Sequence, residues 1–449
     1  MRKGIFYAAI VSLLLVCSVN GSAQVQERLN SPVLTLEEAV QQSLGQNPEL
    51  KAMQKDVDAT KAKVPQARSW DDPLIGVRLY QVPFNGGIGE ASDIDYIVAQ
   101  KIPFPGKKKA ASEIVYHDYL HHLETLNASG RKLLREVKQT YFSLFAINRQ
   151  IAQSKQVEKI LKGLVQSAQS KLATNEATST DALQGQTDLA KLLIEREPLF
   201  ERKKNLEAKL NQLMARSEPG VFSLPTKMEI PKWNVKLEEL IEVAQLRHPS
   251  VKLAEHNVGQ KQWGVKAAKR EYFPDLSAQL EYVQRPNSSP SSNLGNAWTG
   301  EFMINVPLMV KKKSKAVEQA KAELASAVYS QSAAKNEVTY KLQETFAKMK
   351  AAERILQINQ KTLLPQTKQA LEANSVAYAT GKSPFFSYLT ATRSYVDAEL
   401  EYWKSYESLA TSLFELEEAS GVTREEWANL SSSVLPEKEK SEMQKGAKP

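Results

Sequence analysis

The sequence predicts a mainly α-helical protein with a small β part, built from two similar halves. The first observation is a repeat at a spacing of roughly two hundred residues, in which Pro48 corresponds to Pro249 and Leu183 to Leu389. A period of this length indicates two structural halves of one object and not a short-repeat solenoid. The second observation is composition: the 449 residues include only 19 glycines and 20 prolines, and 24% are charged, which is typical of long helices.

Each half begins with two short helices. Residues 35–50 and 236–251 share the order Leu-Glu-Glu followed by a proline. Thr35 with Glu38 three residues later has the spacing of a capping box. A proline is tolerated in the first turn of a helix, so the second helix of each half is expected to start there.

After these helices the hydrophobic period changes to two, which predicts a pair of strands in each half. We expect strands at about 74–82 and 93–102, and again at about 275–284 and 297–306. The segment between the strands of each pair is rich in residues that favour loops.

Long helices follow each strand pair. They are predicted at about 107–172 and 180–216 in the first half, and at about 311–377 and 385–420 in the second. Apolar residues in these helices recur in steps of three and four, the pattern of a coiled-coil seam. At ~1.5 Å per residue, the first of them is on the order of 100 Å long.

The chain therefore divides into five segments. The first is a secretory signal peptide, because basic residues, an apolar run and small residues precede Gln24. The predicted segments are the signal peptide at 1–23, the first repeat at 24–218, a connector at 219–235, the second repeat at 236–421 and a polar C-terminal tail at 422–449.

Cys17 is the only cysteine and lies in the signal segment. Two interpretations follow: cleavage after Ala23, or lipoprotein processing before Cys17, to which the preceding apolar residues are poorly suited. Cleavage after Ala23 leaves a mature chain without a thiol, which excludes disulfides and cysteine-based metal sites or nucleophiles.

Composition and motifs argue against an enzyme. No hydrolytic triad, phosphate-binding glycine loop or paired-carboxylate cleft stands out, so we expect no catalytic residue and no cofactor. The net charge is +8, but the lysines are spread along helices without an aromatic stacking pattern, so no nucleic acid partner is expected either.

The strands determine how this chain is able to cross a membrane. After the signal segment, no apolar stretch reaches the ~18 residues of a spanning helix, whereas the strands approach the ~9–11 residues that a tilted membrane strand needs. Four strands do not close a barrel, and an open sheet edge is not tolerated in lipid. If these strands span a membrane, several copies must share one barrel, of eight strands for two copies or twelve for three.

Together these features resemble the TolC family of outer membrane efflux proteins. The resemblance covers about 35–421 and rests on the duplicated motif, the strand–loop–strand inserts, the junction 100–107 (QKIPFPGK) and the two turns before 180 and 385. It implies a homotrimer in the outer membrane of a Gram-negative bacterium. That trimer would have a shared twelve-stranded β-barrel and a long coiled-coil barrel of α-helices in the periplasm.

The resemblance also implies a function and partners. The protein would be the passive exit duct of a tripartite efflux or type I secretion system. Its partners would be a periplasmic adaptor and an inner membrane pump of the resistance-nodulation-division or ATP-binding-cassette type. The Pro-Phe-Pro-Gly-Lys sequence at 103–107 resembles members that serve heavy-metal cation efflux.

In this family the periplasmic tip closes the tunnel, and aspartates of the second tip form acidic rings. The corresponding residues here are Ser387 and Thr390, so an acidic gate is not expected, and the neighbouring aromatic residues are expected to narrow the pore. Asp181 of the first tip is either a gate residue or a helix cap. The gate candidates are Asp181, Phe385, Phe386, Ser387, Tyr388 and Thr390.

Two lysine clusters occupy the strand-to-helix junctions. The helix dipole disfavours positive charge at a helix start, so we interpret them as anchors to lipid headgroups; the alternative is ordinary solubility charge. The anchor candidates are Lys107, Lys108, Lys109, Lys311, Lys312 and Lys313, and the aromatic residues Tyr80, Tyr96, Tyr282 and Trp298 form either interfacial belts or ordinary strand packing.

His117 and His121 are weak metal candidates, because their i, i+4 spacing suits a transition metal. A duct should release its cargo, and two histidines leave a metal under-coordinated, so we favour a hydrated helix face and no metal site.

The competing hypothesis for the whole chain is a soluble periplasmic coiled-coil adaptor or scaffold. An adaptor hairpin has no need for two membrane-length strand pairs, each flanked by long helices, so the strand inserts favour the channel.

Overall fold

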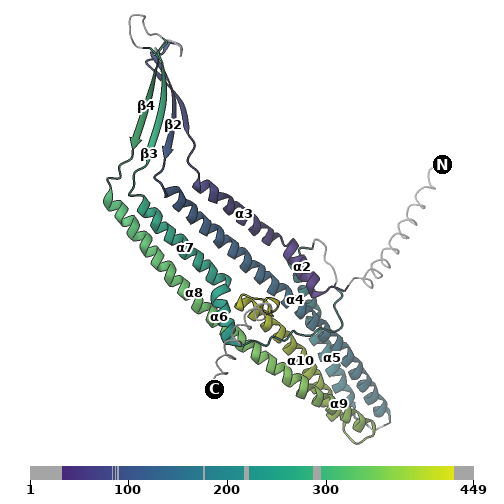
Figure 1. Ribbon diagram of the computed structural model, residues 1–449. Coiled ribbons are helices and arrows are strands. Elements are labelled where there is room, and N and C mark those ends of the chain that lie inside the picture. The colour runs from purple at the N-terminus through teal and green to yellow at the C-terminus, as the bar shows by residue number, and fades with distance from the viewer. Residues whose placement is uncertain are drawn as a thin grey trace, which may run out of the picture. The chain divides into compact units, whose positions relative to one another are not determined.

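The computed structural model describes residues 33–428, except 83, 86, 88–89, 175–176, 217–221 and 287–294. The predicted signal peptide, Cys17 and most of the predicted tail lie outside the described residues. The mainly helical fold with a small antiparallel sheet is confirmed (Figure 1).

The first repeat contributes six elements to this fold. They are α2 (Leu36–Gln46), α3 (Pro48–Arg68), β1 (Leu74–Tyr80), β2 (Asp93–Ile102), α4 (Lys107–Ala173) and α5 (Ser179–Leu213). The second repeat follows the same order, with one long helix interrupted. Its elements are α6 (Leu237–Arg247), α7 (Pro249–Arg270), β3 (Leu276–Gln284), β4 (Ala297–Ile304), α8 (Val310–Ile358), a π-helix (Asn359–Leu363), α9 (Leu364–Ala379) and α10 (Phe385–Ser420).

The chain forms two compact units, and each draws on both repeats. Ala52–Ala128 and Pro249–Val338 form what we call the sheet unit, which contains all four strands. Met1–Lys51, Ser129–His248 and Thr339–Pro449 belong to the second, which we call the coil unit. Among the described residues, no helix combines the length and the apolarity that a membrane crossing requires.

The sheet is antiparallel throughout, in the order β1-β2-β3-β4 (Figure 1). The central pair, β2 with β3, joins the two repeats over nine residue pairs, from Ile94↔Gln284 to Ile102↔Leu276. Within the described residues, the outer strands β1 and β4 each pair on one side only.

Helix starts follow the capping chemistry. The predicted box at α2 is confirmed: the Glu38 amide donates to Thr35 Oγ1 at 3.2 Å, and the Thr35 amide donates to the Glu38 carboxylate at 3.0 Å. At α5 we expected Thr180 or Asp181 as the cap, but the N-cap is Thr178, which has extended backbone angles. Asp181 stands three residues later and accepts the Thr178 amide at 3.0 Å, so it completes a second capping box.

The coil unit is built on the predicted seam. Val137, Tyr141, Leu144 and Ile147 of α4 are almost completely buried. The Tyr141 hydroxyl donates to the Leu34 carbonyl at 2.6 Å, which satisfies its only buried polar group. Burial of this seam is what makes so long and polar a helix stable, since helix propensity alone contributes little.

Two predicted segments differ from the structure: one helix is interrupted, and the C-terminal tail begins later. The helix expected over 311–377 is broken by the π-helix Asn359–Leu363, because Pro365 has no amide hydrogen for the carbonyl four residues earlier. The buried Asn359 amide occupies the bulge and donates to Ser405 Oγ at 3.1 Å. The tail expected from 422 starts later, since Val422 is buried and residues 424–428 form a helical turn.

One buried ion pair ties α4 to α10 inside the coil unit. Lys138 Nζ lies 2.7 Å from Glu417 Oε2, and the two side chains are only 10% and 8% exposed. The Lys138 ammonium also lies 5.4 Å from the centre of the Phe414 ring. Burial raises the pKa of Glu417, and the attraction of Lys138 opposes that rise.

His248, at the end of α6, lies against the turn that ends α10. Gly421 there has φ +68°, and a Cβ at this position would be 2.9 Å from His248 Cα. Burial lowers the pKa of His248 to about 4, although a hydrogen bond with the Glu418 backbone acts in the opposite direction. His248 corresponds to Asn47 in the first repeat, whose side chain accepts the amides of Glu49 and Leu50.

We predict that Lys138→Met destabilises the coil unit by about 3–5 kcal/mol, because it leaves the Glu417 carboxylate buried without a cation beside it. The double variant Lys138→Met/Glu417→Leu should recover most of that loss, because both charges are gone. Thermal and denaturant unfolding of the three proteins measures the difference. A double variant no more stable than the single one would contradict this account.

We predict that acid destabilises the protein through His248. Above pH 6.5 the imidazole is neutral in both states, so it contributes no penalty. Between pH 6.5 and 4 the unfolded chain takes up the proton before the folded chain does, and about 3 kcal/mol of stability is lost. His248→Asn, the residue of the first repeat, should flatten this part of the unfolding profile, and equal pH slopes in the two proteins would refute the assignment.

Candidate functional site

The sheet has one almost wholly apolar face. In the observed register Val77 pairs with Tyr96, Tyr96 with Tyr282 and Tyr282 with Trp298, so these side chains share a face. Gln100 and Gln284 are the only polar side chains among the described residues of this face. Its other members are Ile75, Val77, Leu79, Ile94, Tyr96, Val98, Ile102, Leu276, Ala278, Leu280, Tyr282, Trp298, Gly300, Phe302 and Ile304.

The opposite face of the same strands is polar and carries linked charges. The Arg78 guanidinium lies 3.7 Å from Asp95 and 3.5 Å from Glu281, and it donates to Tyr80 Oη at 3.0 Å. Gln279 donates to the Glu281 carboxylate at 3.3 Å. This alternation of apolar and polar residues matches a barrel wall with lipid on one side and water on the other.

Three of the four aromatic residues singled out in the sequence form a row across the apolar face. The Tyr96 and Tyr282 ring centres are 6.3 Å apart, and those of Tyr282 and Trp298 are 5.0 Å apart. The row lies near the hairpin-loop ends of the strands, two residue pairs from the last β2–β3 pair. Tyr80 is not part of it, because it shares the polar face with Arg78.

The junction between β2 and α4 is tightly built. The Phe104 and Phe273 rings stack with centres 4.5 Å apart, and the Phe104 amide donates to Asp275 Oδ1 at 2.9 Å. Gly106 has φ +93°, and a Cβ there would be 3.1 Å from the Arg270 guanidinium carbon, so this turn requires glycine. The motif at 100–107, which supported the family resemblance, therefore forms a tightly packed junction between β2 and α4.

Two lysines of this junction form ion pairs within the chain. Lys107 Nζ lies 2.9 Å from Asp275, and Lys108 Nζ lies 2.8 Å from Asp71. Lys109 is exposed, as are Lys311 and Lys312 at the second junction.

The second tip turn divides the gate candidates into two groups. Phe385 is only 5% exposed and packs in a core cluster with Leu164, Leu192 and Tyr378. Phe386 is 64% exposed. Helix periodicity explains the difference, because positions 385 and 389 point into this cluster, and positions 386 and 390 lie on the exposed face of α10.

The remaining tip residues follow the same division. Thr390 is exposed beside Phe386, Ser387 is half-buried, and Tyr388 packs against the core cluster. Of the three aromatic residues expected to narrow a pore, Phe385 has its ring buried in packing, and Phe386 is the most exposed. Asp181 has the geometry of a cap, as described above.

The sequence analysis missed an ion pair that joins α5 to α10. The Arg393 guanidinium contacts both carboxylate oxygens of Asp188, whose side chain is only 4% exposed. Nearby, Lys171 Nζ donates to the Tyr378 carbonyl at 3.0 Å and lies 4.2 Å from the centre of that ring. No pattern in the sequence marks these partners, because each pair is about two hundred residues apart along the chain.

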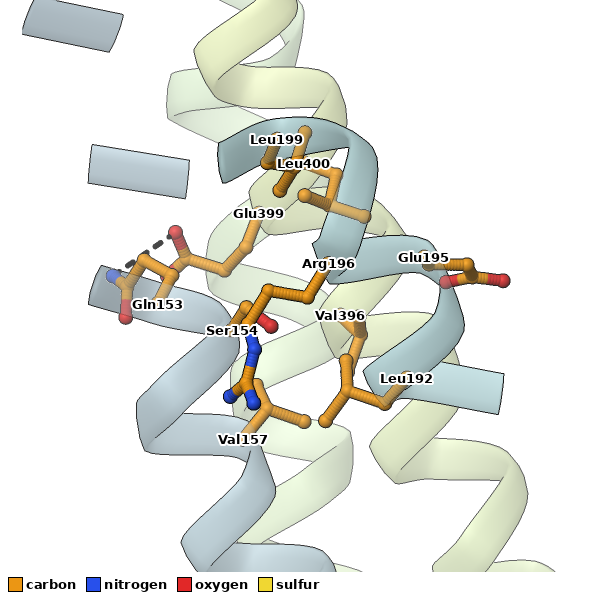
Figure 2. Close-up of a pocket in the computed structure, with 10 residues that line it drawn as sticks. All are labelled: Gln153, Ser154, Val157, Leu192, Glu195, Arg196, Leu199, Val396, Glu399 and Leu400. Carbon is orange, nitrogen blue, oxygen red and sulfur yellow. Dashed lines mark hydrogen bonds between the residues drawn. The ribbon is translucent and has the colours of Figure 1, made fainter. Parts of the chain in front are cut away.

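Figure 2 shows a small pocket between α4, α5 and α10 of the coil unit. Gln153 donates to the Glu399 carboxylate at 3.2 Å on one side, and Arg196 pairs with Glu158. The volume of about 20 Å³ holds no more than one water molecule, so this pocket is a packing defect and not a ligand site.

The two histidine candidates, His117 and His121, are not placed as joint ligands of a metal ion. His117 packs against Gly259, where a Cβ would be 2.3 Å from its ring, and its ring centre lies 6.2 Å from that of His256. Burial lowers the pKa of His117 and, separately, that of His256. His121 is exposed. Within the described part of the chain, no group of three or more His, Cys, Asp or Glu residues is placed to hold a metal ion.

Comparison with known proteins assigns a family. The sequence model of the outer membrane efflux protein family matches residues 39–215 and 240–422, which include both strand pairs. This match decides against the soluble adaptor. No protein with a curated function matches the sequence significantly.

Three solved structures have a similar fold. The MtrE outer membrane channel of Neisseria gonorrhoeae has a TM-score of 0.73 at 16% identity, covering 86% of this chain and 89% of that one. The outer membrane protein VceC of Vibrio cholerae has a TM-score of 0.71 at 14% identity, covering 87% and 96%. The CmeC outer membrane channel of Campylobacter jejuni has a TM-score of 0.68 at 16% identity, covering 86% and 85%.

The matched ranges, the two-faced sheet and the duplicated helices agree with one another. The chain therefore belongs to the outer membrane efflux protein family, and it is an efflux channel of the outer membrane.

Proposed function

We propose that three copies of this chain assemble into a passive exit duct of the outer membrane. The observation that carries the proposal is the two-faced sheet, in which β1 and β4 each pair on one side only. In lipid, such edges must be paired with another copy. Three chains give twelve strands, an allowed barrel size, and the resemblance to the TolC family supports three copies over two.

Channels of this family work with a periplasmic adaptor and an inner membrane pump. We propose a pump of the resistance-nodulation-division or ATP-binding-cassette type, and export of the chain through its predicted signal peptide. For the cargo we propose a heavy-metal cation, supported by the Pro-Phe-Pro-Gly-Lys junction at 103–107.

Deletion of the gene should then make the cell more sensitive to metal salts. Unchanged metal tolerance after deletion would contradict the proposal of a metal cargo.

For the tip, we propose that the exposed face of α10 around Phe386 and Thr390 narrows the duct. The Arg393–Asp188 pair supports this, because it holds α10 against α5 close to that face. The Tyr378 and Phe385 rings lie 5.9 Å apart behind it and fix the start of α10. Opening then requires α10 to move Arg393 away from the buried Asp188 carboxylate, and the cost of leaving that carboxylate unpaired keeps the resting duct closed.

We predict that oxidation covalently links the copies through their edge strands. Cysteines at Ile75 in β1 and Phe302 in β4 lie on the apolar face, and paired strands bring Cα atoms to about 5.5 Å, within disulfide range. With Cys17→Ser as background, the Ile75→Cys/Phe302→Cys protein should migrate as a trimer after heating without reductant.

Ile75→Cys/Leu280→Cys is the matched control. Its positions lie on β1 and β3, which are separated by β2. It should remain a heat-dissociated monomer. A series of cysteine pairs along β1 and β4 in which none forms trimers would contradict the shared barrel.

We predict that Phe386→Ala raises single-channel conductance in planar bilayers, because it removes an exposed ring from the narrow end. Phe385→Ala should leave conductance near the wild-type value but destabilise the coil unit by about 3–5 kcal/mol, because that ring is buried. Bilayer recording with parallel thermal unfolding separates the two effects. The reverse pattern would place the constriction elsewhere.

A further inference from the structure

The two lysine clusters look equivalent in sequence, but their structural environments differ. In the first, the Lys107 side chain is only 13% exposed and lies 2.9 Å from Asp275 and 3.5 Å from Glu271. Lys108 pairs with Asp71. These two lysines are already neutralised by residues of the same chain, and only Lys109 of this cluster is exposed without an ion pair in the described chain, so the first cluster has less charge to offer a lipid than its sequence suggests.

In the second cluster two lysines have no partner within the described part of the chain. Lys311 and Lys312 are exposed, and neither forms an ion pair or a hydrogen bond there. Only Lys313 is engaged, through the backbone carbonyl of Glu271. Lys311 and Lys312 lie in the first turn of α8, which has no acidic residue, so the helix dipole opposes their charge.

The residues immediately before these lysines are apolar and exposed. Val306 and Val310 are each 59% exposed, Leu308 is 79% exposed and Met309 is 72% exposed. They continue directly from Phe302 and Ile304, which belong to the apolar face of the sheet. An apolar segment followed at once by unpaired lysines is the pattern of a polypeptide that lies at a membrane interface.

We propose that residues 306–312 form an interfacial anchor that binds anionic phospholipid headgroups of the periplasmic leaflet. The four apolar side chains extend the lipid-facing surface, and Lys311 and Lys312 bind headgroup phosphates where the chain leaves the acyl region. The lysine charge has no counterpart in this part of the chain, so phosphatidylglycerol or cardiolipin complements it better than a zwitterionic lipid does. In the first cluster, by contrast, two of the three lysines are paired inside the chain.

This inference rests on the proposed function, because it requires the sheet to lie in a bilayer. The competing occupant of the exposed segment is a second copy of this chain, since β4 is an edge strand. The test therefore reports lipid contact and oligomeric state in the same sample.

The experiment uses the trimer reconstituted in phosphatidylethanolamine vesicles with 20% phosphatidylglycerol. A fluorophore is attached at Ser314→Cys in the Cys17→Ser background, beside the two lysines. A nitroxide on one lipid or the other then quenches it, which gives the relative affinity for phosphatidylglycerol over phosphatidylethanolamine. We expect a clear preference for phosphatidylglycerol that falls between 0.05 M and 0.5 M salt, because screening weakens exposed charge pairs.

Lys311→Gln/Lys312→Gln should lower this preference by about fivefold for each lysine removed. The matched control is Lys321→Gln/Lys368→Gln, which removes two exposed lysines of α8 and α9 and should leave the preference unchanged. Leu308→Ser/Met309→Ser should reduce quenching by both lipids without changing their ratio. Lys107→Gln should affect assembly and leave the ratio intact in any protein that inserts.

Each adverse outcome has a separate meaning. Equal quenching by both lipids in an inserted wild-type trimer overturns the anchor and leaves the channel intact. Absence of quenching by either lipid shows that a second copy covers the segment, which also overturns it. A wild-type protein that neither inserts nor forms trimers overturns the proposed function itself.

Discussion

The unpaired edges of β1 and β4 are the constraint on which the rest of the structure depends. A strand edge presents a row of backbone amides and carbonyls, and each one left unsatisfied in hydrocarbon costs several kcal/mol. The apolar face of the sheet is favourable in lipid, whereas its open strand edges are not. A single chain has both, so it cannot satisfy both conditions alone. The assembly that we propose resolves the conflict, because each β4 then pairs with the β1 of another copy. In that proposal, oligomerisation is a requirement of the membrane sheet and not an addition to a finished fold.

The coil unit solves a different problem, since it must hold long helices together with a narrow apolar seam. Polar links supplement that seam: Lys138 with Glu417 and Asp188 with Arg393 each connect α10 to a helix of the first repeat. In each link the carboxylate is buried, so the pair adds little net stability, but any displacement that takes the cation away from that carboxylate is penalised. Such links hold the helices of the coil unit in one register. The stability itself comes from burial of residues such as Tyr141 and Leu144.

Most of the fold was predictable because its signals are local. The capping box at Thr35, the strand periods and the seam spacing depend on residues a few positions apart, and the structure agrees with them. The site was less predictable, because long-range contacts decide it. The use of Lys107 depends on Asp275 and the burial of Phe385 depends on Leu164, and neither partner is visible from the local pattern. The π-helix had a local signal in Pro365. The burial of the Asn359 side-chain amide in it, however, depends on tertiary contact with Ser405.

The two repeats differ at their tip turns and at their strand-to-helix junctions, and these differences bear on function. A duplicated chain begins with two equal junctions and two equal tips, and packing alone gives no reason to change one of each. Here the first tip starts with the Thr178–Asp181 capping box, whereas the second starts with Pro384 and no side-chain cap. The second tip therefore lacks the side-chain hydrogen bonds that fix the first, and the start of α10 is held by the packing of Phe385 against Tyr378 instead. The junctions differ in the same direction: two of the three lysines of the first are paired inside the chain, whereas the second leaves two lysines and four apolar side chains exposed. The second tip and the second junction thus leave more side chains without a partner inside the described chain, and these are the surfaces for which we propose roles in the duct and at the lipid interface.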